Sequence, residues 1–289
     1  MESSFELASL HMRGLVSMIQ LRGGLENFNH LQTLQRVITW ADFCFSSTWS
    51  LPPWFPLLDS LSQPLVPFDR QHRVRHVQPV MGKRFLNICE PPESLLTLLD
   101  MLRSISQSIS LFPTIGSDRV AISNSIYVVE YKLLSIQHLH LGRQHAKNQI
   151  DISECVSLAA LLYLHLAVRE LPLKAHRHKQ LKERLFHSLP HDQNLSSAVG
   201  SETDLTLLLW AFFIGMDTTT RQEPQESLIK RMSELSTVLC LEKYEDFISA
   251  LKTVLWMDQF CEPRAIHLWD EITLRTRETM QLFHLNVVY

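Results

Sequence analysis

Apolar residues recur every three or four positions along most of this chain, and this spacing predicts a series of amphipathic helices. Two of them form a hairpin around Gly23 and Gly24, because glycine ends helices in the left-handed conformation without a Cβ clash. Ser3 with Glu6 matches a capping box for the first helix, and Asn27 or Asn29 is placed to cap the second. The residues expected in the buried seam are Leu7, Leu10, Leu15, Met18 and Ile19, and Leu31, Leu34, Ile38, Ala41 and Phe45.

Further helices are predicted along the rest of the chain, at 93–109, 123–141, 152–170, 174–189, 225–239, 244–255 and 264–273. The run from Leu205 to Met216 is apolar on all sides, which predicts a buried central helix, with a buried strand as the alternative for part of it. The chain of 289 residues contains only eight glycines. We therefore expect an all-α fold: one irregular helical domain over 1–289, with about eight to ten helices.

Prolines concentrate between residues 46 and 92, where they predict a long irregular connection with a short helical piece at 57–62. Aromatic residues in this connection indicate that it packs on the domain surface. A polar loop is predicted at 192–200.

Several short motifs occur in the order found in one protein family. They are His11-x-x-Gly14-Leu15, Met18-Ile19-x-Leu21-Arg22-Gly23-Gly24-Leu25, Trp40-Ala41-Asp42, Pro56-Leu57-Leu58-Asp59, Pro64-Leu65-Val66-Pro67-Phe68, Leu209-Trp210-Ala211-Phe212-Phe213-Ile214-Gly215 and Leu255-Trp256. The ordered set resembles the regulatory domain of fungal-specific transcription factors, which usually follows a binuclear zinc cluster that binds DNA. The resemblance implies an all-helical, non-catalytic module of the nucleus that acts through intramolecular, ligand or coregulator contacts.

The chain departs from that family in its cysteines. Five cysteines lie far apart, so no zinc cluster can be assembled from local pairs, and they are expected to be reduced and buried. The formal net charge of −3 also argues against sequence-independent binding to nucleic acid. We expect no direct DNA binding by this chain, which is then a truncated gene product or a shortened accessory protein. The expected partners are coregulators or a zinc cluster factor, with a homo-oligomer as a further option.

Segments that target membranes are not evident in the sequence. Glu2 and Glu6 do not suit a signal peptide, and the longest apolar run, Leu205 to Met216, is shorter than the roughly twenty residues that span a bilayer. The expectation is a soluble intracellular protein located in the nucleus.

The sequence predicts no catalytic, cofactor-binding or metal-binding residue. His72 and His76, near Asp69, have helical ligand spacing, but their neighbours are basic and repel a cation. The basic run at 174–184 could contact phosphate or direct nuclear import, although a solvated helix face is the simpler interpretation. Asp42 is expected to cap a neighbouring helix or to pair with Arg13 or Arg22.

Neither the cysteines nor the familiar catalytic motifs indicate an enzyme. Cys44 and Cys155 are expected to be inert inside apolar helix faces. The sequence contains no serine-hydrolase elbow, no phosphate-binding loop and no dinucleotide fingerprint.

Two alternatives to the regulatory interpretation stay open. One is a helical interaction protein unrelated to transcription, which binds its partner through an exposed apolar groove. The other, ranked last, is an enzyme with a helical cavity that acts on an apolar small molecule.

Overall fold

The structure is a computed structural model that describes residues 2–58, 95–111, 116–141, 152–172, 176–188, 201–216 and 223–286. These residues form ten α-helices, with one short 3-10 helix and one π-helical turn, and they contain no strand. The predicted all-α class is therefore confirmed. None of the described helices has both the length and the apolar character needed to cross a bilayer.

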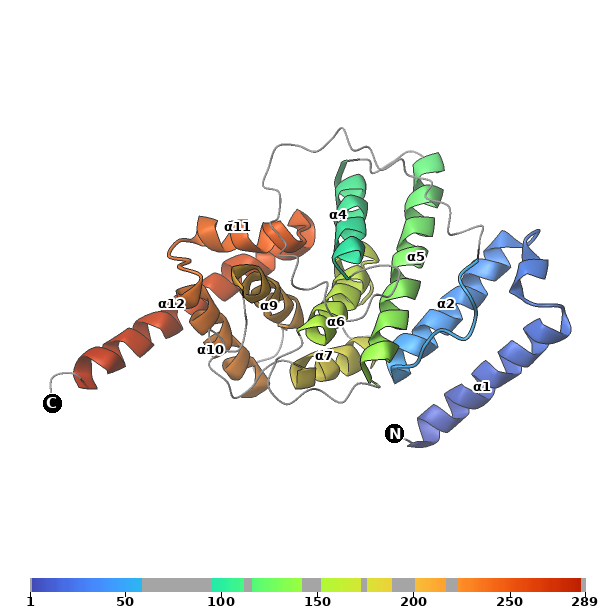
Figure 1. Cartoon of the computed structure of the whole chain (residues 1–289), viewed down its shortest axis with the longest axis horizontal. Helices are drawn as coiled ribbons and strands as arrows, with labels where there is room; N and C mark the ends of the chain where they lie inside the picture. The colour runs from blue at the N-terminus through green and yellow to red at the C-terminus, as the bar shows by residue number, and fades with distance from the viewer. Residues whose placement is uncertain are drawn as a thin grey trace.

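The N-terminal hairpin consists of α1 (Glu2–Leu21), the 3-10 helix η1 (Leu25–Phe28) and α2 (Gln32–Trp49). Gly23 and Gly24 have φ angles of 86° and 98° and end α1 as predicted. The amide of Gly24 donates to the carbonyl of Ile19 at 3.0 Å, which closes the last turn. The expected capping box is wrong, because α1 already begins at Glu2 and Ser3 lies within it. Figure 1 shows α1 along the outer edge of the molecule, beside α2.

The core is built around α9 (Glu202–Gly215), whose long apolar run is buried on all sides. Ser201 caps this helix by accepting a hydrogen bond from the amide of Asp204 at 3.2 Å. The helix packs against α6 (Ser153–Tyr163), α10 (Glu223–Val238) and α11 (Tyr244–Val254). The indole N–H of Trp210 donates to the carbonyl of Leu255 at 3.0 Å inside the core. The prediction of a buried central helix is confirmed, and the strand alternative is wrong.

A second group of helices joins this core to the hairpin: α4 (Leu95–Leu111), α5 (Gly116–Leu141) and α7 (His176–Ser188). Leu98, Leu99 and Leu102 of α4 are fully buried, as its stripe predicts. Helix α5 begins seven residues before the predicted start, at Gly116. The periodicity missed this start because Arg119 and Val120 are exposed there and bury no apolar stripe.

The last helix, α12 (Asp258–Asn286), is much longer than the predicted 264–273. Pro263 lies inside this helix, at its sixth residue, where proline removes one backbone hydrogen bond but the helix continues. Cys261, Ala265, Leu268 and Ile272 form its buried side. The charged and polar run at 275–279 interrupts the apolar spacing, which is why the pattern did not predict the full length of the helix.

Several predictions concern residues outside the described ranges. They are the helical piece at 57–62 beyond Leu58, most of the proline-rich connection, the histidine pair at 72 and 76, and the loop at 192–200. The described start of the connection differs from the prediction, since α2 continues to Trp49 instead of ending before Ser46.

Candidate functional site

Helix α1 is apolar on two opposite sides. Its inner side packs on the core through Met12 and Ile19, which are each 5% exposed, supported by Ala8, Leu15 and Val16. Its outer side carries a second series at helical spacing, which we call the outer stripe: Leu7, Leu10, Gly14, Met18 and Leu21. The four larger side chains are 57%, 60%, 58% and 87% exposed. No described residue covers them.

The sequence prediction placed both series in one buried seam, and this is wrong for the outer stripe. Leu7, Leu10 and Met18 were assigned to the core together with Leu15 and Ile19. On a helix, however, residues 15 and 19 lie about 80–120° from position 7, whereas residues 10 and 18 lie within about 60° of it. The spacing places the two series on different faces, but it does not say which face packs on the core, because both are apolar.

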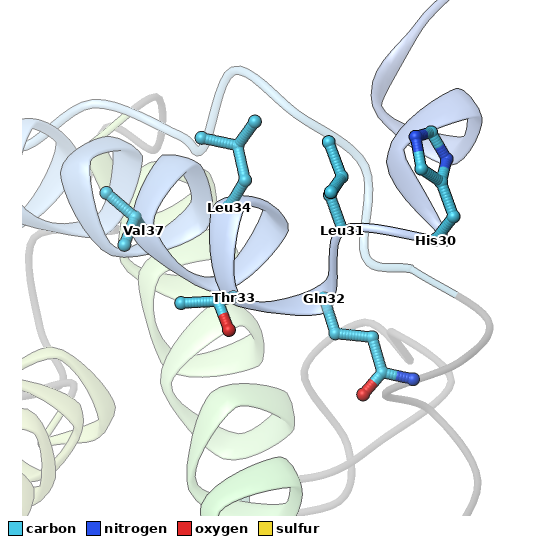
Figure 2. A pocket seen from close by; sticks show the side chains of 6 residues that line it. All are labelled: His30, Leu31, Gln32, Thr33, Leu34 and Val37. Atoms are coloured by element: carbon cyan, nitrogen blue, oxygen red, sulfur yellow. The ribbon is translucent and has the colours of Figure 1, made fainter.

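The first part of α2 and the residue before it carry a second group of exposed apolar residues. Leu31, Leu34 and Val37 are 45%, 40% and 57% exposed, although Leu31 and Leu34 were predicted to be buried. They line an open depression of about 630 Å³ together with His30, Gln32 and Thr33, which we call the tip groove (Figure 2). A smaller depression next to it adds Arg22, Asn27 and Phe28. Further along α2, Ile38 and Phe45 are buried as predicted, while Ala41 is exposed.

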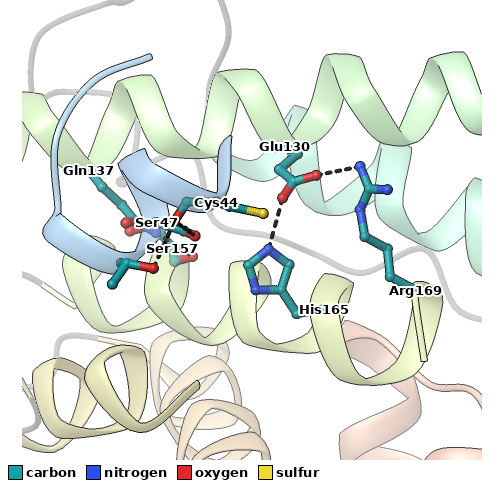
Figure 3. A network of polar contacts seen from close by, with 8 residues as sticks. Cys44, Ser47, Glu130, Gln137, Ser157, His165 and Arg169 are labelled. Carbon is teal, nitrogen blue, oxygen red and sulfur yellow. Dashed lines mark hydrogen bonds and ion pairs between the residues drawn. The ribbon is translucent and has the colours of Figure 1, made fainter. Parts of the chain in front are cut away.

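The other candidate is a buried ionic network between α5 and the π-helical turn η4 (Leu164–Val168), shown in Figure 3. Glu130 and His165 are both fully buried, and Nε2 of His165 lies 2.8 Å from Oε1 of Glu130. The second carboxylate oxygen, Oε2, accepts a hydrogen bond from the guanidinium of Arg169. Arg169 also lies over two aromatic rings, 4.7 Å from the centre of Trp40 and 5.0 Å from the centre of Tyr127.

Electrostatics favour the charged form of Glu130. Burial raises the pKa of this carboxyl, but the Arg169 charge and the His165 hydrogen bond outweigh that effect and bring the pKa below its usual range. An ionised carboxylate accepts hydrogen bonds and does not donate them, so Nε2 of His165 is the donor. Both oxygens of Glu130 are thus used in joining α5 to the turn that follows α6.

The π-helical turn was not foreseen. It extends α6 from Leu164 to Val168, and the amide of Arg169 donates to the carbonyl of Leu164 five residues back, at 2.9 Å. Such turns are rare and frequent at functional sites. None of the residues of this network lines either of the two depressions. Its geometry therefore indicates a structural role in joining α2, α5 and α6. The only sequence signal was that Glu130 and His165 each lie between two apolar or aromatic neighbours.

Asp42 is a buried structural residue with partners other than those predicted. Its Oδ1 accepts the amide N–H of Trp54 and its Oδ2 accepts that of Phe55, each at 3.0 Å. Burial raises its pKa, and these two amides partly oppose the effect. The prediction of a helix cap or of an ion pair with Arg13 or Arg22 is wrong, because the carboxylate instead fixes the chain after α2.

Cysteines and basic residues agree only in part with their predicted surroundings. Cys155 and Cys261 are buried, Cys44 is half-buried, and Cys240 is exposed, against the expectation of burial. These four are in no disulfide. In the basic run, His178 is fully buried and its ring centre lies 5.7 Å from that of His165, while Lys179 is solvated and pairs with Glu183 at 3.9 Å. Within the described ranges, no three His, Cys, Asp or Glu side chains converge as around a metal ion.

The most unusual described feature is therefore the apolar surface of the hairpin, formed by the outer stripe and the tip groove. Comparison of the chain with models of protein families, with curated proteins and with solved structures found no match.

Proposed function

We propose that this chain is a non-catalytic protein-interaction component of transcription regulation, and that it acts through the apolar surface of its N-terminal hairpin. Two observations support the proposal. The ordered motifs of the sequence resemble the regulatory domain of fungal zinc cluster factors, and α1 presents an apolar face that its own fold does not use.

The outer stripe is the observation that carries the proposal. A helix at the edge of a domain needs one apolar face to pack on its core, and α1 already has one in Met12 and Ile19. Leu7, Leu10 and Met18 add a second face that is exposed to water. Contiguous apolar patches on a surface mark interaction sites. A straight row of side chains at three- and four-residue spacing fits another helix, so a helix of a protein partner is the class of ligand proposed.

A tethered reporter tests the regulatory part of this proposal. The full chain is fused to a DNA-binding module of known specificity, and expression from a promoter with its binding sites is compared with that of the module alone. We expect a change in expression, which the double variant Leu10→Glu with Met18→Glu abolishes because it places carboxylates on the stripe. The matched control is Ile266→Glu, an apolar residue of α12 that is 52% exposed and lies outside the hairpin.

An interaction protein unrelated to transcription is the second candidate, and the same apolar surface supports it. Two measurements distinguish these candidate functions: the location of the chain in the cell and the response of the tethered reporter. A chain that stays out of the nucleus and leaves the tethered reporter unchanged contradicts the regulatory proposal. If it still binds a partner through Leu10 and Met18, it is an interaction protein only.

A further inference from the structure

The outer stripe of α1 is nearly symmetric about Gly14. Positions 7 and 21 are both leucine, positions 10 and 18 are leucine and methionine, and Gly14 lies halfway between the members of each pair. A Cβ atom added at Gly14 would meet nothing within 4 Å, so the surface at this midpoint is open. A twofold contact between identical chains requires such a self-complementary surface, in which residue i contacts residue j and residue j contacts residue i.

We infer that the occupant of the outer stripe is a second copy of this chain, with the two α1 helices packed antiparallel across a twofold axis at Gly14. The arrangement places Leu7 against Leu21 of the other copy and Leu10 against Met18 of the other copy. Glycine at the crossing point lets the two backbones approach closely. The inference rests on the proposed function for the use of this surface, and it specifies the partner.

Charge favours the antiparallel orientation. In the first half of α1, residues 4–12 include the acid Glu6 and no lysine or arginine, while residues 13–22 include Arg13 and Arg22 and no acid. Antiparallel packing about Gly14 brings Glu6 of each helix level with Arg22 of the other, because both lie eight residues from the axis, whereas the two copies of Arg13, one residue from the axis, lie close together and repel. Parallel packing would place like charges side by side at both ends, which is unfavourable.

The length of the outer stripe limits the area that the dimer can bury, and therefore its expected affinity. From Leu7 to Leu21 it extends about 21 Å along the helix, at 1.5 Å per residue. One helix pair of this length buries less than the roughly 800 Å² per partner of a standard interface. We therefore expect a weak dimer, with a dissociation constant on the order of 10 µM.

Sedimentation equilibrium of the full chain tests the association itself, over concentrations from about 1 µM to about 200 µM. Wild-type protein should change from monomer to dimer in this range. Leu10→Glu should weaken the dimer about 30-fold or more, whereas Ile266→Glu should leave it unchanged. Circular dichroism checks that both variants are folded. A chain that stays monomeric over the whole range overturns the inference.

Cysteine cross-linking tests the axis and the orientation, in a background with Cys240→Ser and Cys89→Ser, which removes the one exposed thiol among the described cysteines and the thiol outside the described ranges. Helix axes about 8–10 Å apart leave facing Cα atoms about 3.5–5.5 Å apart, which a disulfide can join. Gly14→Cys should therefore form a covalent dimer on mild oxidation, and the exposed control Gln20→Cys should not.

A mixture of Leu7→Cys and Leu21→Cys chains should cross-link, while each chain alone should not, because in an antiparallel pair the two copies of position 7 are about 21 Å apart. Cross-linking of Leu7→Cys with itself would overturn the antiparallel arrangement.

The two proposals fail in distinguishable ways. The chain could prove to be monomeric while the Leu10→Glu and Met18→Glu substitutions still abolish the reporter response. That result would support the proposed function and refute self-association, and the stripe would then bind a different protein. A dimer that cross-links through Gly14→Cys but leaves the reporter unchanged retains the inference and refutes the regulatory function.

Discussion

Glu130 and His165 are 35 residues apart in the chain, yet Oε1 of one lies 2.8 Å from Nε2 of the other in a fully buried contact. The same carboxylate binds Arg169, which in turn lies over Trp40 of α2. Three helices from different parts of the sequence are thus joined through one negative charge. A buried ionic group of this kind is costly to break, because each remaining partner is left without its counter-charge.

Replacement of that charge should destabilise the fold. Glu130→Gln keeps the shape of the side chain but leaves the Arg169 guanidinium, whose side chain is 14% exposed, without its negative partner. We expect the free energy of unfolding to fall by about 3 kcal/mol, as measured by urea denaturation. Glu183→Gln is the matched control, since Glu183 belongs to an exposed pair with Lys179 and should change stability by less than about 0.5 kcal/mol. Equal effects of the two variants would contradict a structural role for the network.

Acid should weaken the fold through Glu130. Its pKa is lower in the folded chain than in the unfolded chain, so its contribution to stability is present above the unfolded pKa and is lost as pH falls through the folded one. Asp42 acts in the opposite sense. Its pKa is raised by burial, so its contribution is present at low pH and is lost as pH rises through the raised pKa.

Urea denaturation from about pH 7 to about pH 3 separates these two effects. Glu130→Gln should lose part of the acid-induced fall in stability, whereas Asp42→Asn should make that fall steeper than in the wild type. A Glu130→Gln variant with the same pH profile as the wild type would refute the assignment to Glu130.

The buried centre of this fold was predictable from sequence, and the arrangement of its edges was not. The run from Leu205 to Met216 has no polar side, so burial was its only favourable environment. The buried stripe of α4 followed in the same way from Leu98 and Leu102. In α1, by contrast, apolar residues lie on two faces, and the periodicity does not say which face meets the core.

The candidate sites were hidden for related reasons. Glu130 and His165 come into contact only because α5 packs against the end of α6, and no local residue spacing predicts that packing. The partners of Asp42 are backbone amides of Trp54 and Phe55, and any residue type can supply those. The outer stripe is exposed because no described element packs on it. Apolar residues at helical spacing predict burial, and the sequence does not show which elements pack nearby.

Substitution by alanine should change the free energy of unfolding in opposite directions at two glycines of the hairpin. At Gly23, φ is 86° and an added Cβ would lie 2.1 Å from Nδ2 of Asn27, which donates to the Arg22 carbonyl at 2.8 Å. Gly23→Ala should therefore lower the free energy of unfolding by about 1–3 kcal/mol. Gly14 is in the middle of a helix with open space around it, so Gly14→Ala should raise monomer stability by about 0.5–1 kcal/mol.

Urea denaturation at about 1 µM, where the chain is expected to be monomeric, measures both changes. The same Gly14→Ala variant should weaken the dimer about tenfold, since a methyl group at the crossing point keeps the helices apart. If Gly14 has only a local role in the helix, stability will change and the dissociation constant will not.

Thiol labelling should discriminate two cysteines of the C-terminal half. Cys240 is exposed, whereas Cys261 lies fully buried on α12, where burial raises the pKa of its thiol to about 12. The thiolate is the reactive form, so Cys261 is both inaccessible and protonated at neutral pH. Iodoacetamide followed by peptide mass spectrometry should label Cys240 in the native protein, and Cys261 only when urea unfolds the chain. The unfolding midpoint measured by Cys261 labelling should match that measured by circular dichroism. Rapid native labelling of Cys261 would contradict the packing of α12 against the core.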